Sequence, residues 1–292
     1  MEFFKKFEKN PVFGSGEIGT VFDAYISKQN KMLRMDFSYR GKKSCAVTFS
    51  IDGVSWSAPV LTLTPNPESG WEDEVNRDCV LLIDGVYKMW YTGQANGHSW
   101  IGYAESRDGL VFERKQADPV LSFEEPWEGD SVMNPCVLYE NGVYRMWYSA
   151  GDTYEPNVLA YAESRDGIHW EKYFGNPIFV CDKKNVFEQD RIGGCQVLKT
   201  EDMGYLMFYI GYEDIDTARI CVAHSEDGIG GWKRSTHNPL IEPTAGEWDS
   251  EACYKPTVLW DEEKKMWRLW YNGRTKTNEF IGLAECAVRD LF

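Results

Sequence analysis

Acidic side chains recur through this 292-residue chain at positions that would suit catalytic carboxylates. Four segments each carry an acid seven residues before a Val-Leu pair, and a different residue three before it. The acids are Asp73, Asp130, Asp190 and Glu251, and the residues three before Val are Arg77, Asn134, Gly194 and Lys255. Side chains four residues apart on a strand point to the same face. We therefore expect both rows to face one axis.

A further acid, Asp23, takes the place of Arg77 when Ile26 is aligned with the Val. Carboxylates gathered around one axis repel one another, which raises at least one pKa and sets protonated and ionised carboxyls side by side. Cleavage of a glycosidic bond uses such a pair, one to protonate the leaving oxygen and one to activate water or attack carbon. The alternative is structural: Arg77 and Lys255 would balance Asp23 in an ion-pair network that fills a polar channel.

A repeated motif indicates which elements position these residues. Its fullest copy combines Trp147-Tyr148, the segment 160–167 with its Ser-x-Asp-Gly turn, Trp170 and Asn176-Pro177, and the chain holds five full or partial copies. The Ala-x-Ser positions of three copies, 104, 162 and 223, are 58 and 61 residues apart, a period that suits a four-stranded propeller blade. Alternating, aromatic-rich runs favour strands over helices. We predict an all-β, five-bladed β-propeller.

The fifth copy ends too early to complete a blade. After residues 284–286 too few remain for the Trp…Asn-Pro strand that ends the other copies. At the other end of the chain, Phe4 and Asn10 have the same spacing as Trp170 and Asn176. We predict that the N-terminal strand completes the last blade, which leaves no open sheet edge and makes residues 1–292 one domain.

Features shared by all copies are expected to be scaffold, because every blade needs the same turns and packing. These are the Trp-Glu pairs, the Ser-x-Asp-Gly turns and the Asn-Pro steps. The eight cysteines include no Cys-x-x-Cys pair, and seven fall in predicted strands, so we expect buried free thiols. The axial residues that differ between copies, Asp23, Arg77, Asn134 and Lys255, are the candidates for function.

The composition of the chain excludes some classes of binding partner. A net charge of −15 argues against nucleic acid and anionic membranes as partners. No apolar segment reaches the length of a signal peptide core or a transmembrane span, so we expect a cytoplasmic protein. No motif for a metal, a phosphate-binding loop or a nucleophilic serine is present, so no cofactor is expected. The oligomeric state cannot be deduced from the sequence.

The repeats resemble the five-bladed propeller glycosidases, which include glycoside hydrolase families 43 and 32 and the mannoside phosphorylases of family 130. The Tyr-x-Met-Trp-Tyr, Tyr-Ala-Glu-Ser-x-Asp-Gly and Asn-Pro elements carry this resemblance over essentially the whole chain. It implies a catalytic aspartate near the end of the first innermost strand, which Asp23 matches. It also implies a glutamate acid from a later blade. We favour Glu251 over Glu188, which belongs to a repeated aromatic-acid pair.

A second family signature, Arg-Asp-Pro, is matched imperfectly. The triplet at Arg77 lacks the proline, and the one at Asn134 lacks the acid. The aspartate that tunes the catalytic pKa in these families would then be replaced by Asp73 or Asp130 from the neighbouring row.

The leading hypothesis is therefore a glycoside hydrolase acting on a small oligosaccharide, with Asp23 as base or nucleophile, Asp73 tuning it and Glu251 as acid. The expected substrate-binding residues are Arg77, His98, Asp130, Asn134, Asp190, Arg191, Lys255 and Arg274. A phosphorylase is the first alternative, with phosphate held by Arg77, Lys255 and Arg191. The second is a glycan-binding propeller without catalysis, suggested by the missing acid at Asn134.

Overall fold

The computed structural model describes residues 3–292, which form strands, turns and four short 3-10 helices. The 3-10 helices are η1 (Arg40–Lys42), η2 (Pro67–Ser69), η3 (Pro126–Glu128) and η4 (Val186–Glu188). No α-helix occurs in the described residues, which confirms the all-β prediction. Accordingly, residues 3–292 contain no helix of the length and apolarity needed to cross a membrane.

Within residues 3–292 the antiparallel pairings divide the strands into five groups. The first group is β2 (Val21–Gln29), β3 (Met32–Tyr39), β4 (Ser44–Ser50) and β5 (Val60–Leu63). The second is β6 (Glu74–Ile83), β7 (Val86–Ala95), β8 (His98–Ser106) and β9 (Glu113–Arg114). The third is β10 (Ser131–Glu140), β11 (Val143–Asp152), β12 (Glu155–Ser164) and β13 (Trp170–Lys172). The fourth is β14 (Arg191–Thr200), β15 (Gly204–Tyr212), β16 (Ala218–Ser225) and β17 (Lys233–Arg234). The fifth is β18 (Ala252–Asp261), β19 (Met266–Arg274), β20 (Glu279–Cys286) and, from the other end of the chain, β1 (Lys5–Lys6).

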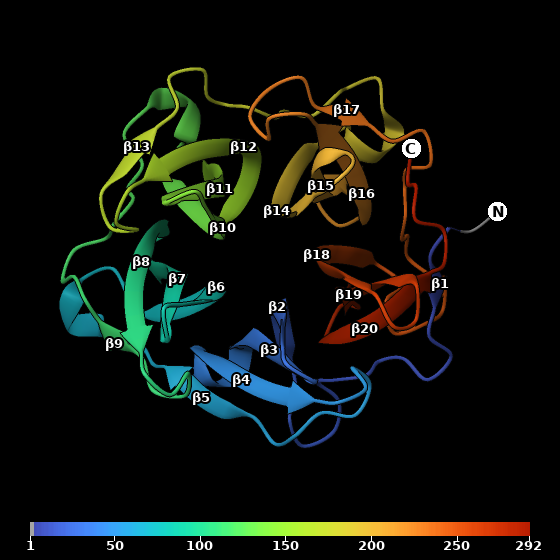
Figure 1. Cartoon of the computed structure of the whole chain (residues 1–292), viewed down its shortest axis with the longest axis horizontal. Helices are drawn as coiled ribbons and strands as arrows, with labels where there is room; N and C mark the ends of the chain where they lie inside the picture. Colours follow the sequence, from blue (N-terminus) through green and yellow to red (C-terminus); the bar gives the residue numbers. More distant parts are fainter. Residues whose placement is uncertain (1–2) are drawn as a thin grey trace.

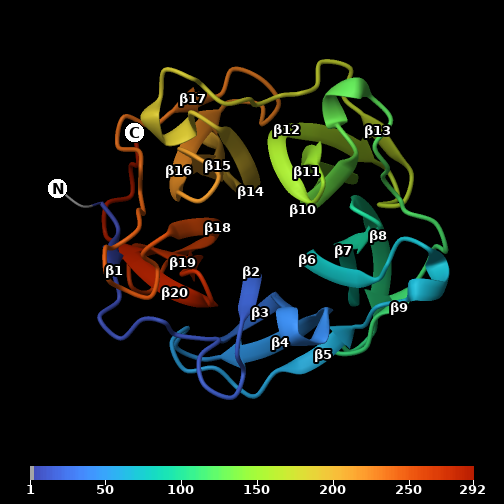
Figure 2. The same ribbon diagram turned by 180° about the vertical axis from the view of Figure 1, so that it is seen from behind.

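The groups are arranged around a central axis, with β2, β6, β10, β14 and β18 innermost (Figures 1 and 2). Single parallel bridges join neighbouring groups, between Ser99 and Ser131 and between Ala218 and Ala252. Apolar side chains of neighbouring groups pack against one another, and all eight cysteines are free thiols. Seven are buried and the eighth, Cys181, is partly buried, which agrees with the expectation of buried thiols.

The N-terminal segment pairs with the last strand of the chain. Strand β1 runs antiparallel to β20, with Lys5 opposite Glu285 and Lys6 opposite Ala284. Asn10 then holds the backbone of Leu283, because its side-chain amide donates to the carbonyl at 2.9 Å and its oxygen accepts from the N–H at 2.8 Å. The predicted pairing of the N-terminus with the final strands is present.

Asn176 and Asn238, the counterparts of Asn10 in the third and fourth groups, hold Tyr161 and Val222 in the same way. The Asn-Pro steps that recur in the sequence therefore share one structural role. Each ends a group by bonding its asparagine amide to the backbone of the third strand.

Four of the groups contain the same buried network, built on the repeated acid of the aromatic-acid pair. The acids are Glu72, Glu128, Glu188 and Asp249, and their side chains are fully buried. A tyrosine hydroxyl donates to each at 2.6, 3.0, 2.5 and 3.0 Å, from Tyr91, Tyr148, Tyr209 and Tyr271 respectively. A cation of the outermost strand completes each network, from Arg114, Lys172, Arg234 and Lys6 at 2.9, 2.8, 2.7 and 2.6 Å. Strand β1 thus supplies the outermost strand of the fifth group, and Lys6 on that strand supplies the cation of its network.

Neighbouring groups are fastened by an indole N–H that reaches the Ser-x-Asp-Gly turn of the next group. Trp90 donates to the carbonyl of Gly167 at 2.8 Å, and Trp270 to that of Gly53 at 2.9 Å. Both glycines have positive φ, 81° and 74°, and a Cβ on either would lie within 2.9 Å of the tryptophan ring. The turn therefore needs glycine for its backbone conformation and for the close approach of the ring.

Side chains of the inner strands form a second set of contacts around the axis. Each accepts a hydrogen bond from a backbone N–H of the next group's inner strand. The pairs are Cys79 with Val137, Cys136 with Val197, Gln196 with Val258 and Thr257 with Ile26. We call these four contacts the axial belt. They join the second group to the third, the third to the fourth, the fourth to the fifth and the fifth to the first.

We expect Lys6→Met to lower the free energy of unfolding by about 3 kcal/mol, because it leaves the buried carboxylate of Asp249 without its cation. Lys5→Met is the matched control, since Lys5 is exposed on the same two-residue strand. Urea unfolding of the two variants and the wild type measures the effect. Equal losses from both would show that the Lys6–Asp249 pair does not secure the N-terminal strand.

Candidate active site

The axial residues that differ between repeats all lie at one kind of backbone feature. Each inner strand has a register shift that leaves two residues, or one in the fourth group, without a cross-strand partner. Asp23, Arg77, Asn134, Gly194 and Lys255 stand at these shifts. Such bulges re-aim side chains and are common beside active sites.

The bulges hold four non-glycine residues in the left-handed region, with φ of 54° at Asp23, 53° at Arg77, 56° at Asn134 and 45° at Lys255. Such a conformation costs on the order of 1–3 kcal/mol and persists where the surroundings fix it. Polar side chains on the second strand of the preceding group help to do this. The backbone N–H of Asp23 donates to Asn272 at 2.8 Å, that of Arg77 to Ser38 at 2.8 Å and that of Asn134 to Thr92 at 3.1 Å.

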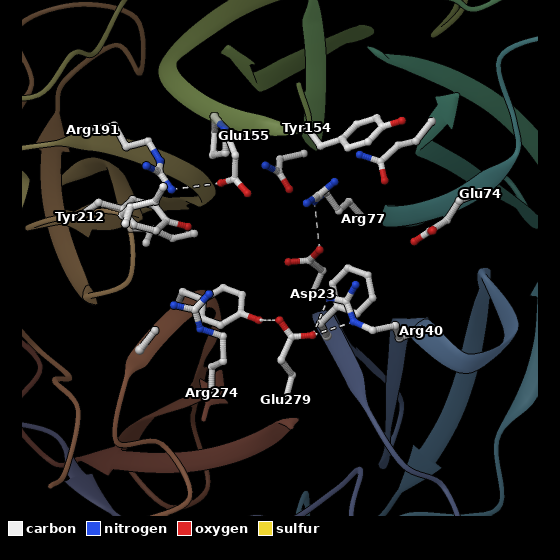
Figure 3. Close-up of a pocket in the computed structure, with 18 of the residues that line it drawn as sticks. Asp23, Arg40, Glu74, Arg77, Tyr154, Glu155, Arg191, Tyr212, Arg274 and Glu279 are labelled. Atoms are coloured by element: carbon white, nitrogen blue, oxygen red, sulfur yellow. Dashed lines mark hydrogen bonds and ion pairs between the residues drawn. The ribbon is translucent and has the colours of Figure 1, made fainter. Parts of the chain in front are cut away.

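Three of these bulge residues, Asp23, Arg77 and Asn134, line a central cavity of about 490 Å³ (Figure 3). Six of the predicted site residues line it: Asp23, Asp73, Arg77, Asn134, Arg191 and Arg274. Lys255 is buried just beside them, with its ammonium 3.4 Å from the side-chain oxygen of Asn134.

Other predicted residues lie outside this cavity. His98 and Asp130 contact each other, because the imidazole Nδ1 is 3.1 Å from the backbone carbonyl of Asp130. Asp190 is exposed and binds Arg191, with 2.5 Å between its carboxylate and the guanidinium. Glu251 lines a separate, neighbouring cavity.

The displacement of Glu251 corrects the expectation that the two axial rows share a face. The four acids of that row each stand immediately before an inner strand, which begins at Glu74, Ser131, Arg191 and Ala252. Alternation of side chains applies within a strand and does not fix the residue that precedes it. Asp73 lines the central cavity, whereas Glu251 does not.

Asp23 is the most deeply buried carboxyl in the cavity lining, with 4% of its surface exposed. Burial raises its pKa, which the positive charges of Arg77 and Lys255 partly oppose and the negative charge of Glu279 reinforces. The Arg77 Nε lies 3.1 Å from Oδ2 in an ion pair, yet its direction does not satisfy that oxygen as a hydrogen bond. The Asp23 carboxyl therefore keeps its proton to a higher pH than an exposed aspartate does.

Glu279 is a further acid of the cavity lining, and it was not among the residues predicted from the sequence. Its carboxylate accepts hydrogen bonds from the Arg40 Nε at 2.8 Å and from the Tyr254 hydroxyl at 2.6 Å (Figure 3). Glu279 begins β20, as Glu155 begins β12, and both line the cavity. An acid at the start of a third strand was the available signal. Arg40 lies in the first group's 3-10 turn, where no repeat pattern marks it.

Arg191 and Arg274, which line the cavity, each have an N–H group that is free to donate a hydrogen bond. Arg191 lies over the ring of Tyr212 at 4.3 Å and pairs with Glu155 at 3.1 Å (Figure 3). Burial is the main cause that raises the pKa of Tyr212 to about 12, so this hydroxyl stays protonated at neutral pH. The buried Nε atoms of both arginines have no hydrogen-bond partner.

Charges in the cavity lining balance, although the chain as a whole is strongly acidic. The cations are Arg40, Lys43, Arg77, Arg191 and Arg274, and the acids are Asp23, Asp73, Glu74, Glu155 and Glu279. Adjacent donors and acceptors suit a ligand rich in hydroxyl groups, and the guanidinium groups suit an anion. No group of three or more His, Cys, Asp and Glu side chains able to hold a metal ion occurs among residues 3–292.

We expect Arg77→Met to raise the pKa of Asp23 further, because it removes the largest influence that opposes burial. Carboxyl-carbon NMR titration of aspartate-labelled protein measures the shift. Arg274→Met, which deletes a charge from the same cavity but not one that acts on Asp23, should leave the titration in place. A similar shift in both variants would mean that overall cavity charge, and not the Arg77 contact, sets this pKa.

Comparison with known proteins places the fold among carbohydrate-active enzymes. The sequence pattern of the "Glycosyl hydrolases family 32 N-terminal domain" matches residues 136–285, just over half of the chain. The crystal structure of a thermostable family-43 glycoside hydrolase superposes with a TM-score of 0.77 over 97% of this chain and 94% of that one, at 18% identity. This similarity concerns the fold.

Two sequence relatives extend the comparison. Uncharacterized protein Rv1502 of Mycobacterium tuberculosis is 28% identical over 286 residues, which cover 91% of this chain and 88% of the relative. A 1,2-beta-oligomannan phosphorylase of a Thermoanaerobacter species is 27% identical over 199 residues, covering 64% and 61% respectively. The matched family pattern and the propeller-glycosidase fold agree, and the chain belongs to the glycosyl hydrolases family 32 N-terminal domain family, among the propeller-type glycosidases.

Proposed function

We propose that residues 1–292 form a single five-bladed propeller, each strand group being one blade, that cleaves a glycosidic bond of a small oligosaccharide by phosphorolysis. The observation that carries the proposal is that Asp23, a buried carboxyl with a raised pKa, shares the central cavity with the guanidinium groups of Arg77 and Arg191. Glu251, the expected second catalytic carboxyl, lines another cavity. Phosphorolysis requires one acid and a site for phosphate, and these residues are the candidates for both.

In the proposed reaction a phosphate oxygen forms a bond to the anomeric carbon as the bond from that carbon to the glycosidic oxygen breaks. Asp23 donates its proton to the departing oxygen, so the products are a sugar phosphate and a shortened saccharide. Its raised pKa supports this role, because a general acid works best when it still holds its proton near the operating pH. Asp23 is thereby assigned as the acid, in place of the base or nucleophile expected from the sequence.

Phosphate is proposed to bind Arg77, Arg191 and Arg274, all of which line the cavity. Guanidinium groups bind phosphate oxygens in pairs, and the unpartnered Nε of Arg191 offers a donor for this. Lys255 adds a positive charge close by. The 27% identity to a 1,2-beta-oligomannan phosphorylase supports the same reaction and suggests β-1,2-linked mannosides as the substrate class.

The sugar is proposed to lie between Asp73, Asn134 and the aromatic faces of Tyr212 and Tyr254, which line the same cavity. Such a lining combines hydroxyl partners with apolar ring surface, as is usual in small-molecule pockets. His98, Asp130 and Asp190, which lie outside the cavity, remain proposed only as contacts at its rim. A cytoplasmic location, expected from the sequence, would suit phosphorolysis because the sugar phosphate is kept in the cell.

Hydrolysis is the second candidate, because Glu279 lies near enough to Asp23 to raise its pKa. Two neighbouring carboxyls with separated pKa values are the arrangement that a glycosidase uses. Asp23 would again protonate the leaving oxygen, and Glu279 would activate water once its contacts with Arg40 and Tyr254 relax.

We expect wild-type protein incubated with β-1,2-linked mannobiose or mannotriose to release a mannose phosphate only when inorganic phosphate is present. Asp23→Asn should lower this rate about 10²- to 10⁴-fold, because it removes the general acid. Mass spectrometry of the products separates the outcomes. Release of free mannose without phosphate would establish hydrolysis. Saccharide binding with no turnover under either condition would instead establish a glycan-binding protein.

Arg191→Lys should raise the KM for phosphate about tenfold while the KM for the saccharide changes less, because lysine keeps the charge but loses the paired donors. Arg165→Lys is the control, since Arg165 is exposed on an outer Ser-x-Asp-Gly turn. Initial rates at varied phosphate and fixed saccharide measure the effect. An unchanged phosphate KM in Arg191→Lys would contradict the proposed phosphate contact.

A further inference from the structure

A second cavity of about 610 Å³ lies beside the central one, and the side chain of Arg274 lines both. It lies between the turn that joins β15 to β16 and the segments that precede β18 and follow β19. The residues that matter for its chemistry are Asp216, Thr217, Arg219, Ser250, Glu251 and Lys276. The proposed reaction gives this cavity no role.

Two buried donors in this cavity have no acceptor. The Nε atoms of Arg219 and Arg274 are buried and make no hydrogen bond. Arg219 uses Nη1 for Glu213 at 2.5 Å, while its Nε lies 3.6 Å from Glu242, which is too far for a hydrogen bond. A buried donor without a partner costs about 1–3 kcal/mol. A ligand that brought acceptors to both arginines would recover part of that cost.

The remaining lining indicates what kind of ligand would fit. Asp216 and Glu251 supply carboxylate acceptors beside these cationic donors, and Thr217 and Ser250 add hydroxyl groups. A sugar hydroxyl both donates and accepts, so adjacent hydroxyls can use donors and acceptors together. A phosphate carries a net negative charge and only one or two hydroxyl groups at neutral pH, so the two carboxylates would repel it. The mixture favours a saccharide over an anion.

We infer that the second cavity binds further sugar units of an oligosaccharide whose reacting bond lies in the central pocket, so that the preferred substrate is longer than a disaccharide. The position of the reacting bond rests on the proposed function. Arg274 would contact the chain where it passes from one cavity to the next. Glu251, which the sequence analysis assigned to catalysis, would here accept hydrogen bonds from a distal sugar.

Binding measured without turnover tests this inference separately from the reaction. In an Asp23→Asn background, calorimetry would compare the affinities of β-1,2-linked mannobiose, mannotriose and mannotetraose. We expect the tetrasaccharide to bind about tenfold more tightly than the disaccharide, as expected for one or two added hydrogen bonds to charged groups. Adding Ala245→Trp, which places a large ring at an exposed position lining the second cavity, should abolish this gain and leave mannobiose binding unchanged.

Ala58→Trp, on an exposed loop of the first group, is the matched control and should keep the dependence on chain length. Equal affinities for all three saccharides would overturn the inference, as would a gain that Ala245→Trp leaves intact. Loss of inorganic phosphate binding in Ala245→Trp, without an effect on saccharides, would identify an anion site and also overturn it. Length-dependent binding that Ala245→Trp abolishes supports the inference even if the wild type turns over no substrate, a result that would reject the proposed function alone.

Discussion

The axial belt is the contact on which the site depends. Four inner-strand side chains each accept a hydrogen bond from the backbone of the next inner strand. Arg77, Asn134 and Lys255 each lie two positions before a belt side chain, and Asp23 lies three before Ile26. The belt therefore helps to fix the spacing of these bulge residues around the axis, together with the hydrogen bonds of their own backbone N–H groups. Strained backbone persists where its surroundings determine it, and here the surroundings are the neighbouring groups.

Burial of carboxyls in this fold suits acid catalysis because it raises their pKa values, but the same burial lowers the free energy of unfolding at neutral pH. The folded-state pKa of Asp23 is raised, and so are those of Asp36 and Asp78. The native state therefore binds these protons more tightly than the unfolded chain does. This contribution to stability is complete below the unfolded pKa and is lost as pH rises through the folded pKa. At neutral pH the buried carboxyl of Asp23, the proposed acid, therefore lowers the free energy of unfolding. The acid–tyrosine–cation networks described above help to offset this loss.

Much of this arrangement was readable from the sequence because the repeats share one geometry. Aligning the Val-Leu pairs identified Asp23, Arg77, Asn134 and Lys255 as equivalent, and the structure finds all four at bulges. The spacing of Phe4 and Asn10 likewise identified the partner of β20.

Residues outside the inner strands were harder to predict, for physical reasons. Glu251 stands just before β18, where strand alternation no longer determines direction. Arg40 and Glu279 meet across the boundary between the first and fifth groups. Their proximity follows from the contact of the first group with the fifth, and a comparison of one repeat with the next contains no information about it.

The pairing of β1 with β20 also determines the order in which parts of the fold can form during translation. Lys5 is synthesised before its partner Glu285, which lies 280 residues later in the chain (285 − 5). At about 5–20 residues per second, translation separates the two by roughly 15 to 60 s. During that interval the first strand has no sheet to join, while the middle groups already have theirs. The fifth group, which contributes Glu279 and Arg274 to the central cavity, can be completed only once β20 has been synthesised, so this side of the pocket is assembled after the middle groups.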